Sequence, residues 1–191
     1  MAWVHPAPGT RIGINGINIF AANSVFIEDT LIRNFTQSGI RDQRTTGGVL
    51  FVNNTTVQHN AGAGILVLPT SGATRIDASL SNVIAERNAD GIRVSNGANV
   101  MVKRSIISGN SNAGVVTEGP AGNSRISVDD SSISNNGTGA LRLPGGSARF
   151  SNSDFAQNTT ARSGANLSSF GNNRLTNNGL DGTAFEPATQ E

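Results

Sequence analysis

Apolar and small polar residues alternate along the chain in a unit that recurs over most of its length. In the unit at residues 102–110, Val102 is followed by Ser105 three positions later, by Ile107 five positions later and by Asn110 eight positions later. Such alternation has the period of a β-strand, whose successive side chains point to opposite faces. The unit returns at intervals of about 20 to 28 residues, a spacing typical of stacked repeat architectures.

Corresponding positions of the units form three columns. The apolar column consists of Ile27, Val52, Leu80, Val102, Val128, Phe150 and Phe170. The small-residue column consists of Thr30, Thr55, Ser105, Ser131 and Ser153, and the Asn column of Asn60, Asn88, Asn110, Asn136, Asn158 and Asn178. A Gly followed by an aliphatic residue, such as Gly64-Ile65, comes a few residues after the Asn position. Each repeat is therefore predicted to consist of a strand, a turn at Asn, a turn at Gly, a second strand and a variable loop, of which 42–47 is an example.

The repeat predicts a parallel β-helix. Corresponding strands are a whole repeat apart, so they cannot form hairpins and must stack in parallel, about 4.8 Å from one another. An inward Asn at a fixed turn would hydrogen-bond the Asn above and below it and satisfy the turn backbone. Such an Asn also tolerates the left-handed conformation that a sharp corner needs. A leucine-rich repeat would require more Leu and a helix-compatible stretch in each unit.

These columns predict one all-β domain over residues 1–191, with about seven coils and an internal Asn ladder. We expect the coils to span 12–178, between an N-terminal segment or cap at 1–11 and a C-terminal tail or cap at 179–191.

Composition narrows the classes of function. The chain has 23 Gly, no Tyr and only 14% charged residues, which disfavours helices and suits short strands joined by turns. A net charge of +1 predicts no strong attraction to nucleic acid. No apolar run is long enough for a membrane span, and the absence of Cys excludes disulfides and thiolate chemistry.

The N-terminus has neither the basic start nor the apolar block of a signal peptide. Because the repeats begin in mid-pattern, we predict that this chain lacks its leader and that the full-length protein is secreted or periplasmic. Loss of N-terminal coils that carry the function is a further possibility.

The repeats resemble those of a known group of proteins. Phe150-Ser151-Asn152-Ser153 with Asn158, leading into residues 169–175, is similar to the bacterial right-handed parallel β-helix repeat proteins of the pectin-lyase-like superfamily. The resemblance covers nearly the whole chain and implies a right-handed helix. It also implies an exported protein without an assigned function. The wider superfamily implies lyases, hydrolases, epimerases and tailspikes that act on or bind glycans.

Catalysis on a polysaccharide would need convergent carboxylates and a base. The acids of this chain are dispersed, and the nearest approach to a pair, Asp130 and Asp154, is offset by two positions around the turn. Calcium is therefore possible but is supported by no acidic cluster, and we predict neither a cofactor nor a metal site. The weak catalytic candidates are His59, Asp90 and Arg93, because a His near a carboxylate can act as an acid or a base.

Two surface features favour binding. Arg41 and Arg93 are predicted to point outward on alternate coils, with Arg87 on a nearby edge, where guanidinium groups would hold sugar carboxylates or sulfates. The same charges would also keep an exposed sheet soluble. Phe26 and Phe51 are predicted to lie side by side on the outside, which is typical of an interface with a second copy or another protein.

Two functional hypotheses follow. The first is a non-catalytic structural or binding protein that presents a flat solenoid face to a glycan or protein partner. The alternative is a polysaccharide lyase or hydrolase that uses Arg41 or Arg93 with Asp90 or His59. An enzyme requires acids and a base that converge in a cleft, whereas a binding protein requires none.

Overall fold

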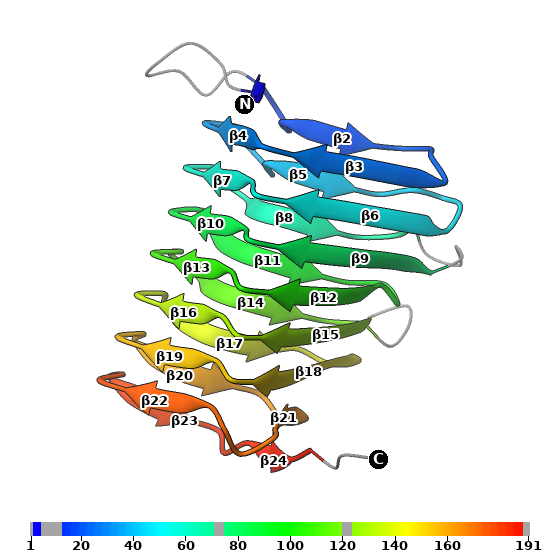
Figure 1. Ribbon diagram of the computed structural model, residues 1–191. Helices are drawn as coiled ribbons and strands as arrows, with labels where there is room; N and C mark the ends of the chain where they lie inside the picture. Colours follow the sequence, from blue (N-terminus) through cyan, green and yellow to red (C-terminus); the bar gives the residue numbers. More distant parts are fainter. Residues whose placement is uncertain (1, 5–12, 71–74, 120–123, 189–191) are drawn as a thin grey trace.

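The computed structural model describes residues 2–4, 13–70, 75–119 and 124–188. These residues form strands, turns and loops, with no helix among them. The strands wind into a solenoid of stacked coils, and the two chain ends lie at opposite ends of the stack (Figure 1). The predicted parallel β-helix of about seven coils is confirmed.

Three parallel sheets, each with eight strands, run along the solenoid. Sheet A contains β1 (Ala2–Val4), β4 (Thr30–Arg33), β7 (Thr56–Gln58), β10 (Ile84–Glu86), β13 (Ile106–Ser108), β16 (Ser132–Ser134), β19 (Asp154–Ala156) and β22 (Arg174–Thr176). Sheet B contains β2 (Ile17–Ile19), β5 (Ile40–Asp42), β8 (Ala63–Val67), β11 (Asp90–Val94), β14 (Ala113–Thr117), β17 (Thr138–Arg142), β20 (Thr160–Ser163) and β23 (Leu180–Gly182). Sheet C contains β3 (Ser24–Glu28), β6 (Gly48–Asn53), β9 (Ile76–Ser81), β12 (Asn99–Lys103), β15 (Ser124–Asp129), β18 (Gly146–Ser151), β21 (Leu167–Ser169) and β24 (Glu186–Pro187).

Each coil has three strands, not the two that the sequence predicted. The stretch taken as one strand, as at 52–57, is bent between β6 and β7 at Asn54, where φ is 47°. A left-handed residue ends one strand and turns the chain into the next sheet. Across this corner the inward positions are three residues apart, from Val52 to Thr55, before the two-residue alternation resumes at Val57. The corner therefore shows in the sequence only as a three-residue step.

The apolar column fills the interior, with one exception. Ile27, Val52, Leu80, Val102, Val128 and Phe150 are buried in one continuous core. Phe170 was also expected to point inward, but β21 ends at Ser169, which pairs with Phe150, and Phe170 is half-buried outside. Phe185 packs on the end of the core instead, with ring centroids 5.7 Å from Phe150 and 5.6 Å from Phe155.

The Asn ladder is confirmed. From Asn60 to Asn178, each side-chain amide donates to the Oδ1 of the next ladder Asn at 2.9–3.3 Å. The same Oδ1 accepts the preceding ladder residue's backbone N–H at 3.0 Å. The left-handed conformation, however, belongs to the residue before the ladder Asn, for example His59 with φ 57° and Arg87 with φ 54°. The ladder Asn therefore closes the corner by hydrogen bonding alone.

The strands at both ends of the described chain belong to the sheets of the solenoid. Of the N-terminal segment 1–11, only β1 is described, and it pairs in parallel with β4. At the other end the sheets continue past Asn178 into β23 and β24. Residues 179–188 therefore complete the last coil, and Phe185 covers its interior.

The variable loop predicted at 42–47 contains a buried ion pair. Asp42 and Arg44 have no exposed side-chain surface, and the guanidinium Nη2 lies 2.6 Å from Asp42 Oδ2. Nε donates to Asp42 Oδ1 at 2.9 Å, and Nη1 donates to the Ala22 carbonyl at 2.7 Å. The guanidinium is satisfied on both sides, which is the condition for burying such a charge.

Candidate functional site

The outer face of sheet C carries several neighbouring hollows. Along each long strand the side chains alternate between the core and this face, as in β15, where Arg125, Ser127 and Asp129 point outward. The strand register aligns these positions with the outward residues of β12 and β18. Straight columns of side chains therefore run along the solenoid.

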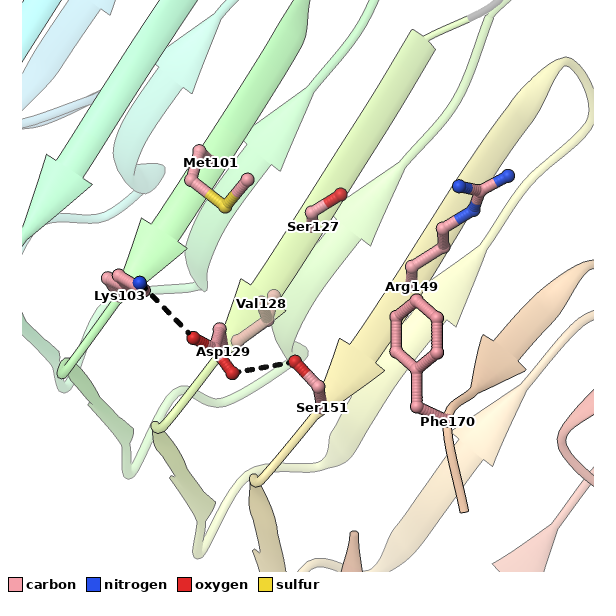
Figure 2. Close-up of a pocket in the computed structure, with 8 residues that line it drawn as sticks. All are labelled: Met101, Lys103, Ser127, Val128, Asp129, Arg149, Ser151 and Phe170. Atoms are coloured by element: carbon pink, nitrogen blue, oxygen red, sulfur yellow. Dashed lines mark hydrogen bonds and ion pairs between the residues drawn. The ribbon is translucent and has the colours of Figure 1, made fainter. Parts of the chain in front are cut away.

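Three hollows on this face share lining residues and form one shallow groove. The first, of about 330 Å³, is lined by Asn99, Met101, Arg125 and Ser127 among others. The second, of about 390 Å³, adds Arg149 to Arg125 and Ser127. The third, of about 360 Å³, extends from Met101 and Lys103 past Arg149 to Phe170, as Figure 2 shows. We call this continuous surface the outer groove.

The charged side chains of the outer groove differ in whether they already have a partner. Arg125 and Arg149 are exposed, and neither forms an ion pair with any residue that the structure describes. Asp129, in contrast, is engaged: its carboxylate lies 3.5 Å from Lys103 Nζ and accepts a hydrogen bond from the Ser151 hydroxyl at 2.6 Å (Figure 2). The groove therefore presents two guanidinium groups without an ion-pair partner among the described residues, and one carboxylate whose charge is balanced by Lys103.

The surroundings of Asp129 keep its carboxyl group ionised. The hydrogen bond from Ser151 lowers the pKa of Asp129, burial opposes this, and Asn152 and Lys103 lower the pKa further. The net pKa lies below the ordinary value. A general acid for glycoside cleavage requires the opposite shift, because it must hold its proton near neutral pH.

Arg93 and Asp90, two of the predicted catalytic candidates, do lie together. Arg93 Nη1 donates to Asp90 Oδ2 at 3.1 Å, and the other side of the guanidinium binds both oxygens of Glu118 at 3.0 Å. Asp90 also accepts a hydrogen bond from Asn112 at 2.6 Å. Burial works to lower the pKa of Arg93, but Glu118 and then Asp90 outweigh it and raise that pKa. This guanidinium is held as a cation between two carboxylates on sheet B.

The remaining predicted candidates form no ion pair with that cluster among the described residues. His59 and Arg87 occupy equivalent left-handed positions between sheets A and B, and no hydrogen bond among the described residues joins His59 to Asp90. Arg41 and Arg93 both align with Leu66 in sheet B, as predicted. Arg41 donates to Gln37 at 3.3 Å, so each of these two arginines already has a partner.

Phe26 and Phe51 lie where the sequence put them, at the N-terminal end of the outer face of sheet C. Their rings stack with centroids 4.8 Å apart and planes 12° apart, and they are 64% and 37% exposed. They align with Ser79 and then Met101 in the same column, so an apolar end of sheet C leads into the outer groove.

Among the described residues, no three His, Asp or Glu side chains gather in a set that could hold a metal ion. Likewise, the described part of the chain includes no helix of a length and apolarity that could cross a membrane.

Arg125 and Arg149 were missed from the sequence. The signal was present: Arg149 immediately precedes the inward Phe150, and Arg125 stands three residues before the inward Val128. Both positions are outward by alternation. They escaped notice because the loop insertions shift the repeats, so the two arginines are neighbours only after the strand register is known.

The fold and the groove place the chain among the right-handed β-helix proteins. The family described as a right handed beta helix region matches residues 42–184, and the chain belongs to that family. Among solved structures it is similar to pectate lyase Pel9A, with a TM-score of 0.55 and 17% identity over 85% of this chain and 52% of the lyase. It is also similar to the A-module of the mannuronan C-5 epimerase AlgE4 of Azotobacter vinelandii, with a TM-score of 0.50 and 12% identity over 88% of this chain and 58% of that one.

At these identities the likeness concerns the pectin-lyase-like fold alone, and the chain spans little more than half the length of either structure. No curated protein sequence matches the chain.

Proposed function

We propose that this chain is a non-catalytic binding β-helix that holds an acidic glycan along the outer groove of sheet C. The observation that carries the proposal is the pair of exposed guanidinium groups, Arg125 and Arg149, which line one hollow and have no carboxylate partner among the described residues. Guanidinium groups bind carboxylate and sulfate oxygens through paired N–H donors.

The dimensions of sheet C support an extended ligand. Arg125 and Arg149 stand on adjacent strands, one two-residue step apart along the strand. Their Cα atoms are therefore about 8 Å apart on a parallel sheet. Met101 and Phe170 add apolar surface to the same groove, and an apolar floor with a few polar groups is typical of small-molecule and glycan sites. A glycan partner also fits the export that the sequence predicted.

The state of the acids supports binding over catalysis. The pKa of Asp129 in the groove and that of Asp154 on sheet A are both lowered, the first by Ser151 and the second by Arg174. Arg93 is committed to Asp90 and Glu118. The alternative, a polysaccharide lyase or hydrolase, draws support from the enzymes of similar fold, but two of the groups expected to serve it, Arg93 and Asp90, are already engaged in an ion pair.

Binding and cleavage are distinguished by one experiment. Thermal unfolding is measured with polygalacturonate, alginate and neutral dextran, and the mixtures are then assayed for shortened or unsaturated products. An acidic glycan at about a hundred times its Kd should add roughly 2.7 kcal/mol to the unfolding free energy, without products. The double variant Arg125→Ala/Arg149→Ala should lose the shift, whereas Arg87→Ala, which removes an exposed charge outside the groove, should keep it.

Two results would overturn the proposal. Shortened or unsaturated products would establish the enzyme alternative. A shift that survives in Arg125→Ala/Arg149→Ala but disappears in Arg87→Ala would move the site to the edge that the sequence first suggested.

A further inference from the structure

A fourth hollow adjoins the outer groove at the corner where sheet B turns into sheet C. It has a volume of about 240 Å³ and is lined by Arg125, Arg142, Gly145, Gly146, Ser147 and Asn166. Arg125 also lines two hollows of the outer groove. A chain lying in the groove would therefore pass the mouth of this corner hollow.

Two guanidinium groups reach the corner hollow from different directions. Arg125 extends from the outer face of β15, and Arg142 comes from the end of β17 in sheet B. Arg142 is fixed in place, because its Nε donates to the Gly146 carbonyl at 2.9 Å. Its terminal N–H groups donate to none of the described residues, and neither arginine has an ion-pair partner among them.

Closely packed backbone at Gly145 and Gly146 forms one side of the corner hollow. A Cβ added at Gly145, where φ is 79°, would collide with the Gly119 carbonyl, and one added at Gly146 would meet the Thr117 backbone at 2.6 Å. The turn is thus packed directly against the coil before it. On the opposite side, the Asn166 backbone N–H donates to the Glu186 carboxylate at 3.1 Å.

We infer that the corner hollow is a subsite for a tetrahedral oxyanion, a sulfate or phosphate ester carried by the glycan in the outer groove. A carboxylate has two oxygens in one plane, and a single guanidinium fork satisfies both. A sulfate or phosphate ester directs three oxygens outward, which suits two guanidinium groups that approach from separate strands together with the side chains of Ser147 and Asn166. This inference rests on the proposed glycan-binding function and specifies the substituent that the glycan carries.

The test compares glycans of matched length and charge density at one salt concentration. Binding of dextran sulfate, phosphorylated dextran, polygalacturonate and neutral dextran is measured by titration calorimetry. The wild-type protein should bind at least one of the two esters about tenfold or more tightly than polygalacturonate, and which ester binds identifies the substituent. Arg142→Gln should abolish this preference while leaving the affinity for polygalacturonate within about twofold. Arg149→Gln should weaken every acidic glycan.

A second variant keeps the test decisive if Arg142→Gln does not fold. Asn166→Asp keeps the shape of the side chain, tolerates the left-handed backbone at φ 55°, and places a negative charge in the corner hollow alone. It should also remove the preference for esters. If the esters bind no more tightly than polygalacturonate, or if both variants keep the preference, the subsite is wrong while the proposed function stands. Failure of every acidic glycan to bind would overturn both.

Discussion

At the scale of single residues, the buried ion pair of Asp42 and Arg44 gives the most direct prediction. In Asp42→Asn the Arg44 guanidinium stays buried but loses its counter-charge, which costs about 3–5 kcal/mol of unfolding free energy. Chemical denaturation measures this loss. Asp77→Asn is the matched control, because Asp77 pairs with Arg75 at 2.9 Å with side chains 58% and 46% exposed for Arg75 and Asp77. That control should lose no more than about 1 kcal/mol. Equal losses in the two variants would refute the burial argument.

The carboxyl group of Asp129 gives a second prediction at this scale. Its pKa is lowered in the folded state, so its contribution to stability is present above the unfolded pKa and is lost as the pH falls through the folded pKa. Ser151→Ala removes the first cause of the shift and should raise the pKa of Asp129 toward the ordinary value. Ser127→Ala, in the same groove, should leave it unchanged. NMR titration of the carboxyl carbon reports both, and a wild-type pKa above the ordinary value would instead favour an acid catalyst.

At the scale of structural elements, removing a ladder Asn should destabilise the protein more in the middle of the Asn ladder than at its end. Asn110 is buried, with its Oδ1 accepting from the Asn88 backbone at 3.0 Å and its Nδ2 donating to Asn136 at 2.9 Å and to the Ala85 carbonyl at 3.1 Å. Asn110→Ala leaves several of these groups unsatisfied, at about 1–3 kcal/mol for each. Asn178→Ala, at the half-buried last rung, should cost less. Denaturation midpoints compare the two, and a larger loss at Asn178 would contradict a cooperative ladder.

The repeats also show which features of the fold can be predicted from the sequence. Columns defined by identical spacing, such as the ladder through Asn110, are predictable because the same side-chain packing recurs in each coil. The exchange of Phe170 for Phe185 at the last coil is not, because the repeat ends there and its spacing no longer defines which side chain covers the core. Burial of Asp42 with Arg44, and the meeting of Arg125 with Arg149, depend on loop paths and register that alternation does not encode.

At the scale of the whole molecule, a solenoid in which each coil touches only its neighbours should open from its ends. The central strands β11 and β14 are almost wholly buried, whereas β22, β23 and β24 at the C-terminal end are mostly exposed. Native-state hydrogen exchange should therefore be slowest from β8 to β17 and faster by about a hundredfold or more in β22–β24, since local opening spans the range from fraying to global unfolding.

The difference in exchange rate between the centre and the C-terminal end must also be independent of protein concentration if it is a property of a single molecule. Edge strands such as β22 and β23 carry backbone groups that a second copy could pair with, and protection at these strands that rises with concentration would mean that another molecule covers this end. Equal protection along the whole chain at all concentrations would show instead that the coils unfold together. The Asn ladder would then couple them more strongly than contacts between neighbours alone, and a defect at Asn110 would be felt in every coil.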